Sequence, residues 1–366
     1  MSNDKNYDQF DQEEFKRSAE KAYSIEDEEF EKIINQELII SLFGEVNAGK
    51  SSTINALLGK KLSEVSAYAG HTSEITLYKF DKNVRIADTP GLNDMKEINS
   101  KKAEDFFEKG TDIILFFFNA AVGCNKSMYD AYNDVKKLNK PILIVLNRID
   151  TWYKDEKLVD KESLEIMVKQ IEDNTNGKVI PISARDDINI ELLNTQILRI
   201  LEKGGKDILF TKLSRFKEDQ VKIWIKGATV TAFGIGVIPI PGVDILPLTT
   251  LQVGLALKIA YIYGNKVSKG DIMQLIGSTI TGSVGKQLFK YAVQALKGLG
   301  YLGGPLTEGA IAIAAGTIAA SITYGFGWAC NAYYKSGMTM DLGKVAEIFN
   351  EKFKEYKKNK DSEKNK

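Results

Sequence analysis

A glycine-rich loop with one lysine and two serines is the first group of residues in this sequence that could do chemistry. It reads Gly44-Glu45-Val46-Asn47-Ala48-Gly49-Lys50-Ser51-Ser52, after an apolar run at 38–43 and before a helical pattern at 50–58. Glycines let a backbone wrap a phosphate chain, and the amides at a helix N-terminus point at the anion. The loop therefore predicts a nucleotide site in which Lys50 faces the β and γ phosphates and the Ser51 hydroxyl binds Mg²⁺.

A second motif for the phosphate side, Asp88-Thr-Pro-Gly91, follows the apolar run at 84–88. A carboxylate at the end of that strand can hold Mg²⁺ through water, and the amide of Gly91 can meet the γ-phosphate. We therefore expect Asp88 to join Ser51 as a metal ligand, and Gly91 to join Lys50 as a catalytic contact.

Two later motifs carry donors and acceptors that suit a purine base. Asn147-Arg148-Ile-Asp150 begins at the end of the run at 142–147, and Ser183-Ala184-Arg185 begins at the end of the run at 179–183. The Asp150 carboxylate can accept from N1–H and N2–H₂ of guanine, a donor pair that adenine lacks, while Asn147 can help to hold the loop and the base's other edge. A backbone amide of the later motif can donate to the guanine oxygen. The expected ligands are therefore GTP and GDP.

The elements that must position these motifs predict an α/β fold. Short apolar runs at 38–43, 76–80, 84–88, 113–119, 142–147 and 179–183 alternate with helical patterns at 50–58, 126–138, 161–174 and 189–202. Continuous apolar strands separated by helices indicate a doubly wound, mostly parallel sheet covered on both faces. The turn at 81–83 predicts a hairpin that makes one edge strand antiparallel. Because ligands bind at the carboxyl ends of parallel strands, all four motifs are expected in one crevice.

Because they carry these four motifs, residues 37–204 resemble a P-loop GTPase domain of the Era/TrmE-like group. The usual Asn-Lys-x-Asp and Ser-Ala-Lys motifs of that group carry arginine here, as Arg148 and Arg185, and both keep a long stem for stacking on the base. Gly70-His71-Thr72 matches the group's Gly-Thr-Thr pattern. The resemblance therefore implies that Thr72 closes on Mg²⁺ and the γ-phosphate, and that the chain hydrolyses GTP to GDP and phosphate.

Two positions bear on the rate of that reaction. Leu92 stands where Ras-like enzymes carry a glutamine that orients the attacking water, so intrinsic turnover is expected to be slow. Similar GTPases use an asparagine at the position of Asn47 to bind a K⁺ ion that bridges the phosphates. The resemblance thus implies K⁺ as a further cofactor, and the alternative is an Asn47 side chain turned to solvent.

Two long stretches in the second half of the chain are nearly free of charge. Residues 227–257 contain one charged side chain, Asp244, and residues 309–334 contain none. Each is long enough to span a bilayer as a helix, although prolines within 239–247 break the first into two helices. This half resembles a hydrophobic domain of unknown function fused behind bacterial GTPase domains, which implies membrane proximity. A soluble, all-helical core is the alternative.

The charge balance also differs between the two halves. Lys and Arg number 49, as do Asp and Glu, yet the chain from Lys206 onward holds 21 basic and 12 acidic side chains, a difference of +9. The first 205 residues therefore carry −9, and the basic half suits an anionic lipid surface. One histidine and two distant cysteines argue against a zinc site. The acidic N-terminus lacks the features of a signal peptide, which favours a cytoplasmic protein.

The expected organisation has an acidic helical segment at 1–36, the GTPase domain at 37–204, an all-α hydrophobic domain at 205–350 that opens with a connecting helix at 207–226, and a charged tail at 351–366. The leading hypothesis is a GTP-hydrolysing switch that controls a membrane-associating helical domain, peripheral or integral at the cytoplasmic face. The alternatives are a membrane-remodelling GTPase of the dynamin or immunity-related type, and a GTP-gated membrane effector with negligible turnover. Lipid is the expected partner and a homodimer through the GTPase domain is left open, whereas no sequence feature favours DNA or RNA.

Overall fold

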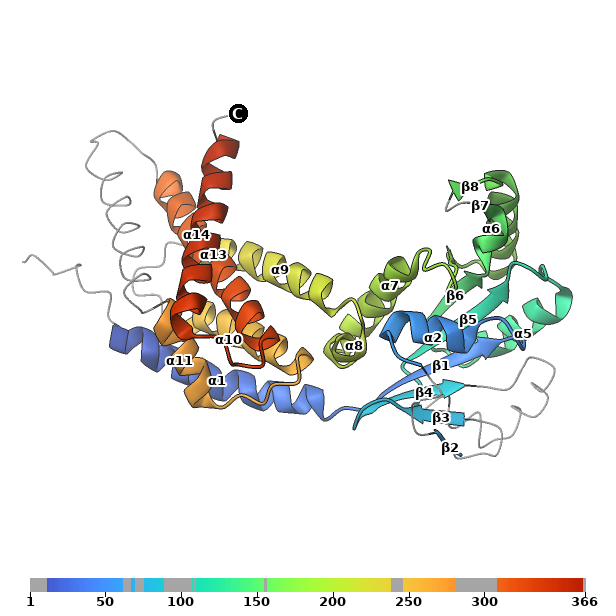
Figure 1. Ribbon diagram of the computed structural model, residues 1–366, viewed down its shortest axis with the longest axis horizontal. Coiled ribbons are helices and arrows are strands. Elements are labelled where there is room, and N and C mark those ends of the chain that lie inside the picture. Colours follow the sequence, from blue (N-terminus) through green and yellow to red (C-terminus); the bar gives the residue numbers. More distant parts are fainter. Residues whose placement is uncertain are drawn as a thin grey trace, which may run out of the picture. The chain divides into compact units, whose positions relative to one another are not determined.

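The computed structural model describes residues 12–61, 67–69, 76–88, 107, 110–154, 157–237, 246–280 and 308–364. Internal contacts divide the chain into two compact units, which are drawn in Figure 1. We call Ile33–Lys217 the sheet unit, and Met1–Lys32 together with Glu218–Lys366 the helical unit. The predicted fold class is confirmed, because a mostly parallel sheet with helices is followed by an all-helical region.

A seven-stranded sheet lies at the centre of the sheet unit, in the order β2-β3-β4-β1-β5-β6-β9. Its strands are β1 (Leu38–Gly44), β2 (Ala67–Ala69), β3 (Thr76–Lys79), β4 (Val84–Asp88), β5 (Ile113–Asn119), β6 (Ile142–Asn147) and β9 (Val179–Pro181). Strands β4, β1, β5, β6 and β9 pair in parallel, and β3 pairs antiparallel with β4 across the predicted turn. The expectation that β3 is an edge strand is wrong, because β2 pairs with its other side.

Helices cover both faces of this sheet. They are α2 (Lys50–Leu58), α5 (Lys126–Lys136), α6 (Lys161–Thr175) and α7 (Ile190–Glu202). Successive side chains of a strand point to opposite faces. On β5, Ile114, Phe116 and Phe118 lie in a buried cluster with residues of α5 and α6, whereas α7 packs on α2 and also contacts β5. Strands β1 and β5 are buried along their whole length, as parallel strands with two covered faces must be.

A short helix, α8 (Asp207–Leu213), ends the sheet unit. Lys206 donates to the Asp112 carboxylate just before it, and Lys212 forms an ion pair with Asp81 near its end. The chain then leaves helical geometry at 214–216, before α9 (Lys217–Val237) begins. The connecting segment expected as one helix at 207–226 is therefore two helices.

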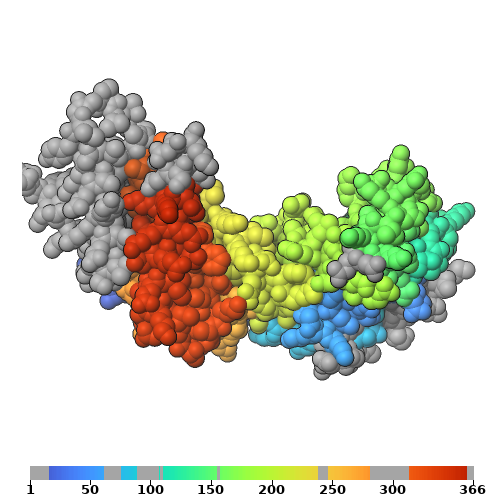
Figure 2. All heavy atoms as spheres, turned by 45° about the horizontal axis from the view of Figure 1, so that its top comes forward, coloured from blue at the N-terminus to red at the C-terminus, as the bar shows by residue number. Residues whose placement is uncertain are grey.

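The helical unit is built from α1 (Gln12–Ile34), α9, α10 (Leu246–Ile262), α11 (Lys269–Thr279), α13 (Glu308–Lys335) and α14 (Leu342–Lys364). Helix α13 packs against α10 and α14, and Figure 2 shows α14 in red at the surface. Helix α1 packs on α10, where the hydroxyls of Ser18 and Thr249 are 2.9 Å apart. The expected division of 227–257 into two helices agrees with the end of α9 and the start of α10. The predicted boundary at residue 351 falls inside α14, and the domain limits stay predictions.

Within the described part of the chain, one helix is long and apolar enough to cross a membrane, Ile313–Lys335 of α13, and 56% of its apolar window is buried. Glycines bring its neighbours close. A Cβ built on Gly316 would lie 2.6 Å from Val237 Cγ2 of α9, and one on Gly325 would lie 2.7 Å from the Phe349 carbonyl of α14. Helix α13 is therefore packed from two sides inside the helical unit.

Candidate nucleotide-binding site

The loop between β1 and α2 has the backbone that a phosphate-binding loop requires. Gly49 caps α2 at φ 84°, and Asn47 also has a positive φ, 63°. A Cβ on Gly44 would lie 2.7 Å from the Phe117 carbonyl of β5, so only glycine fits where β1 ends. The predicted residues Asn47, Ser51 and Ser52 are exposed, whereas Ala48 is buried under the loop.

Lys50 is held inside this loop. Its ammonium group donates to the Gly44 carbonyl at 3.2 Å and to the Glu45 carbonyl at 3.3 Å. Burial lowers the pKa of Lys50, and the nearby Asp88 carboxylate partly opposes that shift. The lysine is thus partly desolvated at the N-terminus of α2, where a phosphate anion would be a strong partner for it.

Asp88 ends β4 and pairs in register with Leu42 of β1, one strand away from the loop. Its Oδ1 is buried and makes no hydrogen bond with the described residues. Burial raises the pKa of the Asp88 carboxyl, and Lys50 partly lowers it. A buried carboxylate oxygen without a protein partner suits a hard cation such as Mg²⁺, so the residues present fit the predicted metal site.

The buried amide of Asn147 joins three loops. Its Nδ2 donates to the Ala48 carbonyl of the phosphate loop at 2.9 Å, and its Oδ1 accepts from the amides of Arg148 at 2.8 Å and Ala184 at 3.2 Å. A Cβ on Gly49 would lie 2.1 Å from Asn147 Nδ2. The sequence predicted that Asn147 helps to hold its own loop and the base's other edge, and the structure also connects it to the phosphate loop and to the last motif.

The base end of the crevice is formed around Asp150, which lies in the 3₁₀ turn η3 (Ile149–Trp152) after β6. Ser183 Oγ donates to Asp150 Oδ1 at 2.8 Å, and Arg185 Nη2 lies 2.9 Å from Asp150 Oδ2. The Asp150 side chain is 10% exposed, whereas Arg185 is 72% exposed. The structure thus brings the two predicted base motifs together, and Arg148 takes the left-handed conformation (φ 67°) between them.

Several predicted residues lie outside the described part of the chain. They are Thr72 and Gly91 of the catalytic set, and the neighbouring His71 and Leu92. The described residues therefore assemble Gly44, Lys50, Asp88, Asn147, Asp150 and the 183–185 motif.

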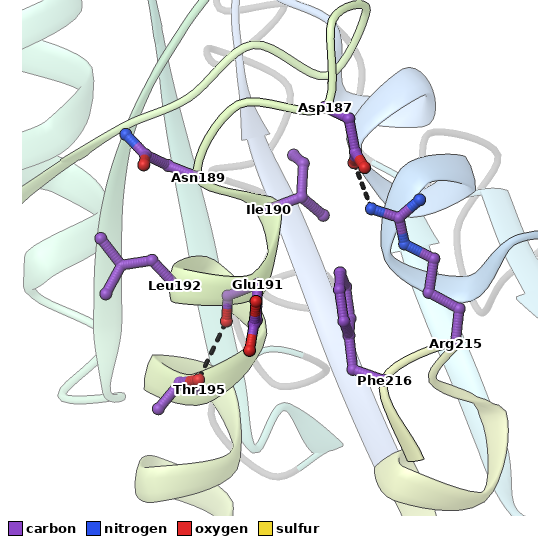
Figure 3. Close-up of a pocket in the computed structure, with 8 residues that line it drawn as sticks. All are labelled: Asp187, Asn189, Ile190, Glu191, Leu192, Thr195, Arg215 and Phe216. Carbon is purple, nitrogen blue, oxygen red and sulfur yellow. Dashed lines mark hydrogen bonds and ion pairs between the residues drawn. The ribbon is translucent and has the colours of Figure 1, made fainter. Parts of the chain in front are cut away.

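Sequence reasoning missed Asp187 and Arg215. Figure 3 shows the Arg215 guanidinium reaching the Asp187 carboxylate beside a cavity of about 480 Å³. Asp187 has φ 61° and Asn189 has φ 57°. The run of Asp and Asn at 186–189 is a signal for such a turn, since these residues tolerate the left-handed region.

Both halves of the chain match known protein families. Residues 39–148 match the family described as 50S ribosome-binding GTPase, and residues 210–358 match a domain of unknown function, DUF697. The chain therefore carries an Era/MnmE/Der-like GTPase domain followed by a C-terminal DUF697 domain.

Individual relatives cover part of this chain. Translation initiation factor IF-2 of Fervidobacterium nodosum is 29% identical over 52% of this chain and 27% of that protein. GTPase Era of Aquifex aeolicus is 29% identical over 45% of this chain and 57% of that protein. A crystal structure of an A. aeolicus Era variant bound to GDP·AlF₄⁻ is 26% identical, covers 45% of this chain and 57% of that one, and has a TM-score of 0.34. The chain thus spans between about a quarter and just over half of these relatives.

Proposed function

We propose that this P-loop GTP-binding GTPase is a molecular switch with slow intrinsic turnover, whose nucleotide state controls its helical unit. The observation that carries the proposal is the set of three hydrogen bonds made by Asn147, because they join the phosphate loop to both base motifs. A crevice connected in this way can respond at its base end to events at its phosphate end. Such a response is what a nucleotide switch needs.

Guanine selectivity is assigned to Asp150. Its two oxygens are matched to the N1–H and N2–H₂ donors, and Ser183 and Arg185 hold the carboxylate at the crevice. Asp150→Asn replaces one acceptor by a donor, so we expect the variant to lose GTP affinity and to gain affinity for xanthosine triphosphate, which presents an acceptor there. Asp186→Asn is the control, because Asp186 also binds Arg185 but follows the Ser-Ala-Arg motif. Equal GTP binding by wild type and Asp150→Asn would refute the assignment.

The phosphate side is assigned to Lys50 and to a Mg²⁺ ion held by Ser51 and Asp88. The ion would neutralise charge on the β and γ phosphates. Lys50 would bind the same phosphates, since it already lies among the loop carbonyls. From the sequence, Thr72 and Gly91 complete this set. Lys50→Ala should abolish tight nucleotide binding, whereas Thr72→Ala should keep binding and lose turnover.

A K⁺ ion at Asn47 is the proposed source of extra positive charge. The support for this assignment is the position of Asn47 in the phosphate loop, because its exposed side chain and left-handed backbone fit the solvent-facing alternative equally well. Replacing K⁺ by Na⁺ should then slow GTP hydrolysis several-fold while leaving GDP affinity unchanged. Equal rates in both salts would point instead to a group supplied by a partner.

Membrane lipid is the proposed partner of the helical unit, which would bring the chain to the cytoplasmic face of a membrane. The apolar helix α13 supports this choice over RNA, and the +9 balance from Lys206 onward suits an anionic lipid surface. More protein should float with anionic liposomes when a non-hydrolysable GTP analogue replaces GDP. Equal flotation would remove the coupling between nucleotide and membrane. Turnover stimulated by liposomes would favour membrane remodelling, and binding without turnover would favour a GTP-gated effector.

A homodimer through the sheet unit is the proposed assembly. Light scattering would report it as a higher mass with the GTP analogue than with GDP. The same mass in both states would exclude dimerisation driven by GTP.

A further inference from the structure

The junction between α8 and α9 contacts two elements of the nucleotide site. The Arg215 amide donates to the Leu57 carbonyl at 3.1 Å, in the last turn of α2, the helix that starts at the phosphate loop. The Arg215 guanidinium forms an ion pair with Asp187, as Figure 3 shows. Ser214 Oγ lies 2.7 Å from Asn194 Oδ1 of α7, which anchors the junction from a third side.

Asp187 belongs to a small closed loop, 183–188, which we call the base loop. The amide of Ser183 donates to the Ile188 carbonyl at 3.1 Å, and the Ile188 amide donates back at 3.0 Å. The Asp186 amide donates to Ser183 Oγ at 3.1 Å. Because the loop is closed at its base, a displacement of Asp187 is transmitted to the backbone amides and the Arg185 side chain of the 183–185 motif, the groups expected to meet guanine.

We propose that Arg215 is a positioning residue for guanine recognition, which acts through Asp187 to hold the base loop at a fixed distance from the phosphate-loop helix. The inference rests on the proposed guanine specificity of the site. Arg215 forms a second connection between the base and phosphate ends, in addition to that made by Asn147. Its guanidinium lies 4.5 Å from the centre of the Phe216 ring, and this contact restricts its orientation.

The position of Arg215 also matters for signalling. It lies two residues before α9 begins, and the chain passes into the helical unit at Glu218. A shift of the base loop would therefore reach the start of α9 through one ion pair. Arg215 thus contacts the base loop and also lies next to the start of the helical unit.

The test compares GDP and ADP affinities of the full chain carrying Arg215→Gln, with dissociation constants measured by competition against fluorescent GDP. Both partners are partly exposed, at 34% and 58%, so the ion pair is a modest one. We expect GDP affinity to fall about threefold, within the range of surface ion pairs. ADP affinity should stay the same, because adenine does not use the base loop. Arg215→Lys, which keeps the charge, should recover most of the loss.

Two further variants separate positioning from general destabilisation. Asp187→Asn keeps a residue that tolerates φ 61° and removes the charge, so it should weaken GDP binding as Arg215→Gln does, and the double variant should add nothing. Lys161→Gln removes another exposed ion pair, with Glu165, and should change neither affinity. Unchanged GDP affinity in Arg215→Gln, or an equal loss for GDP and ADP, would overturn the proposal. Failure of wild type to prefer GDP over ADP would refute the proposed function itself.

Discussion

Replacing Asn147 by alanine tests whether one buried amide holds the crevice together. The side chain is 2% exposed, and its removal leaves the Ala48 carbonyl and the amides of Arg148 and Ala184 without their partner. At about 1 kcal/mol net for each hydrogen bond, the free energy of unfolding should fall by about 3 kcal/mol. GDP affinity should fall by at least about tenfold, because binding must then order the loops.

Asn119 provides a matched control. It occupies the paired register position on β5, is also 2% exposed, and among the described residues its side chain makes one hydrogen bond, to the Ala121 amide at 3.1 Å. Asn119→Ala should therefore cost about 1 kcal/mol. Denaturant unfolding can be followed through Trp152 of the sheet unit, in a chain whose other two tryptophans are replaced by phenylalanine. Equal losses of unfolding free energy in the two variants would contradict the reasoning.

Four other substitutions have definite expected outcomes. Gly49→Ala should lower GDP affinity by more than about tenfold in a titration, since it combines strain at φ 84° with a clash against Asn147. Burial raises the pKa of Asp88, so the ionised carboxylate opposes folding at pH values above that raised pKa, and the wild type should become more stable as pH falls through it toward 3.8. Asp88→Asn should abolish this pH dependence and increase the free energy of unfolding near neutral pH. The same variant should lose GTP hydrolysis. In α9, Gly234→Ala should raise the melting temperature because nothing described lies within 4 Å, whereas Gly236→Ala should lower it because its Cβ would meet α13 at 2.8 Å.

The fold of the sheet unit was predictable because its strands are continuous apolar runs and its motifs follow their carboxyl ends. The prediction had no signal for β2, since three residues, Ala67–Ala69, carry no pattern of alternation. It also missed the break at 214–216. There Ser214 is buried and Arg215 bonds to α2 and Asp187, so contacts distant in sequence interrupt a pattern that is locally helical.

The residues of the site also divide into those that the sequence could predict and those that it could not. Lys50, Asp88 and Asp150 could be assigned from motif spacing, because each is proposed to bind the nucleotide or its metal ion. The connecting role of Asn147 and the Arg215–Asp187 pair could not, because they depend on which loops meet in space. Motif spacing identifies residues that face a ligand, but it does not identify the residues that hold those ligand-facing side chains in position.

The charge-free stretches show where composition alone is ambiguous. A helix without charges satisfies a bilayer and the centre of a helical bundle equally well, since both require apolar surface and internal backbone hydrogen bonds. Contacts separate the two cases. Gly236 and Gly316 bring α9 against α13, Gly325 admits Phe349 of α14, and 56% of the apolar window of α13 is buried. Much of the apolar surface that suggested a membrane is therefore used within the helical unit, so a switch that exposes α13 to lipid must first separate these glycine contacts.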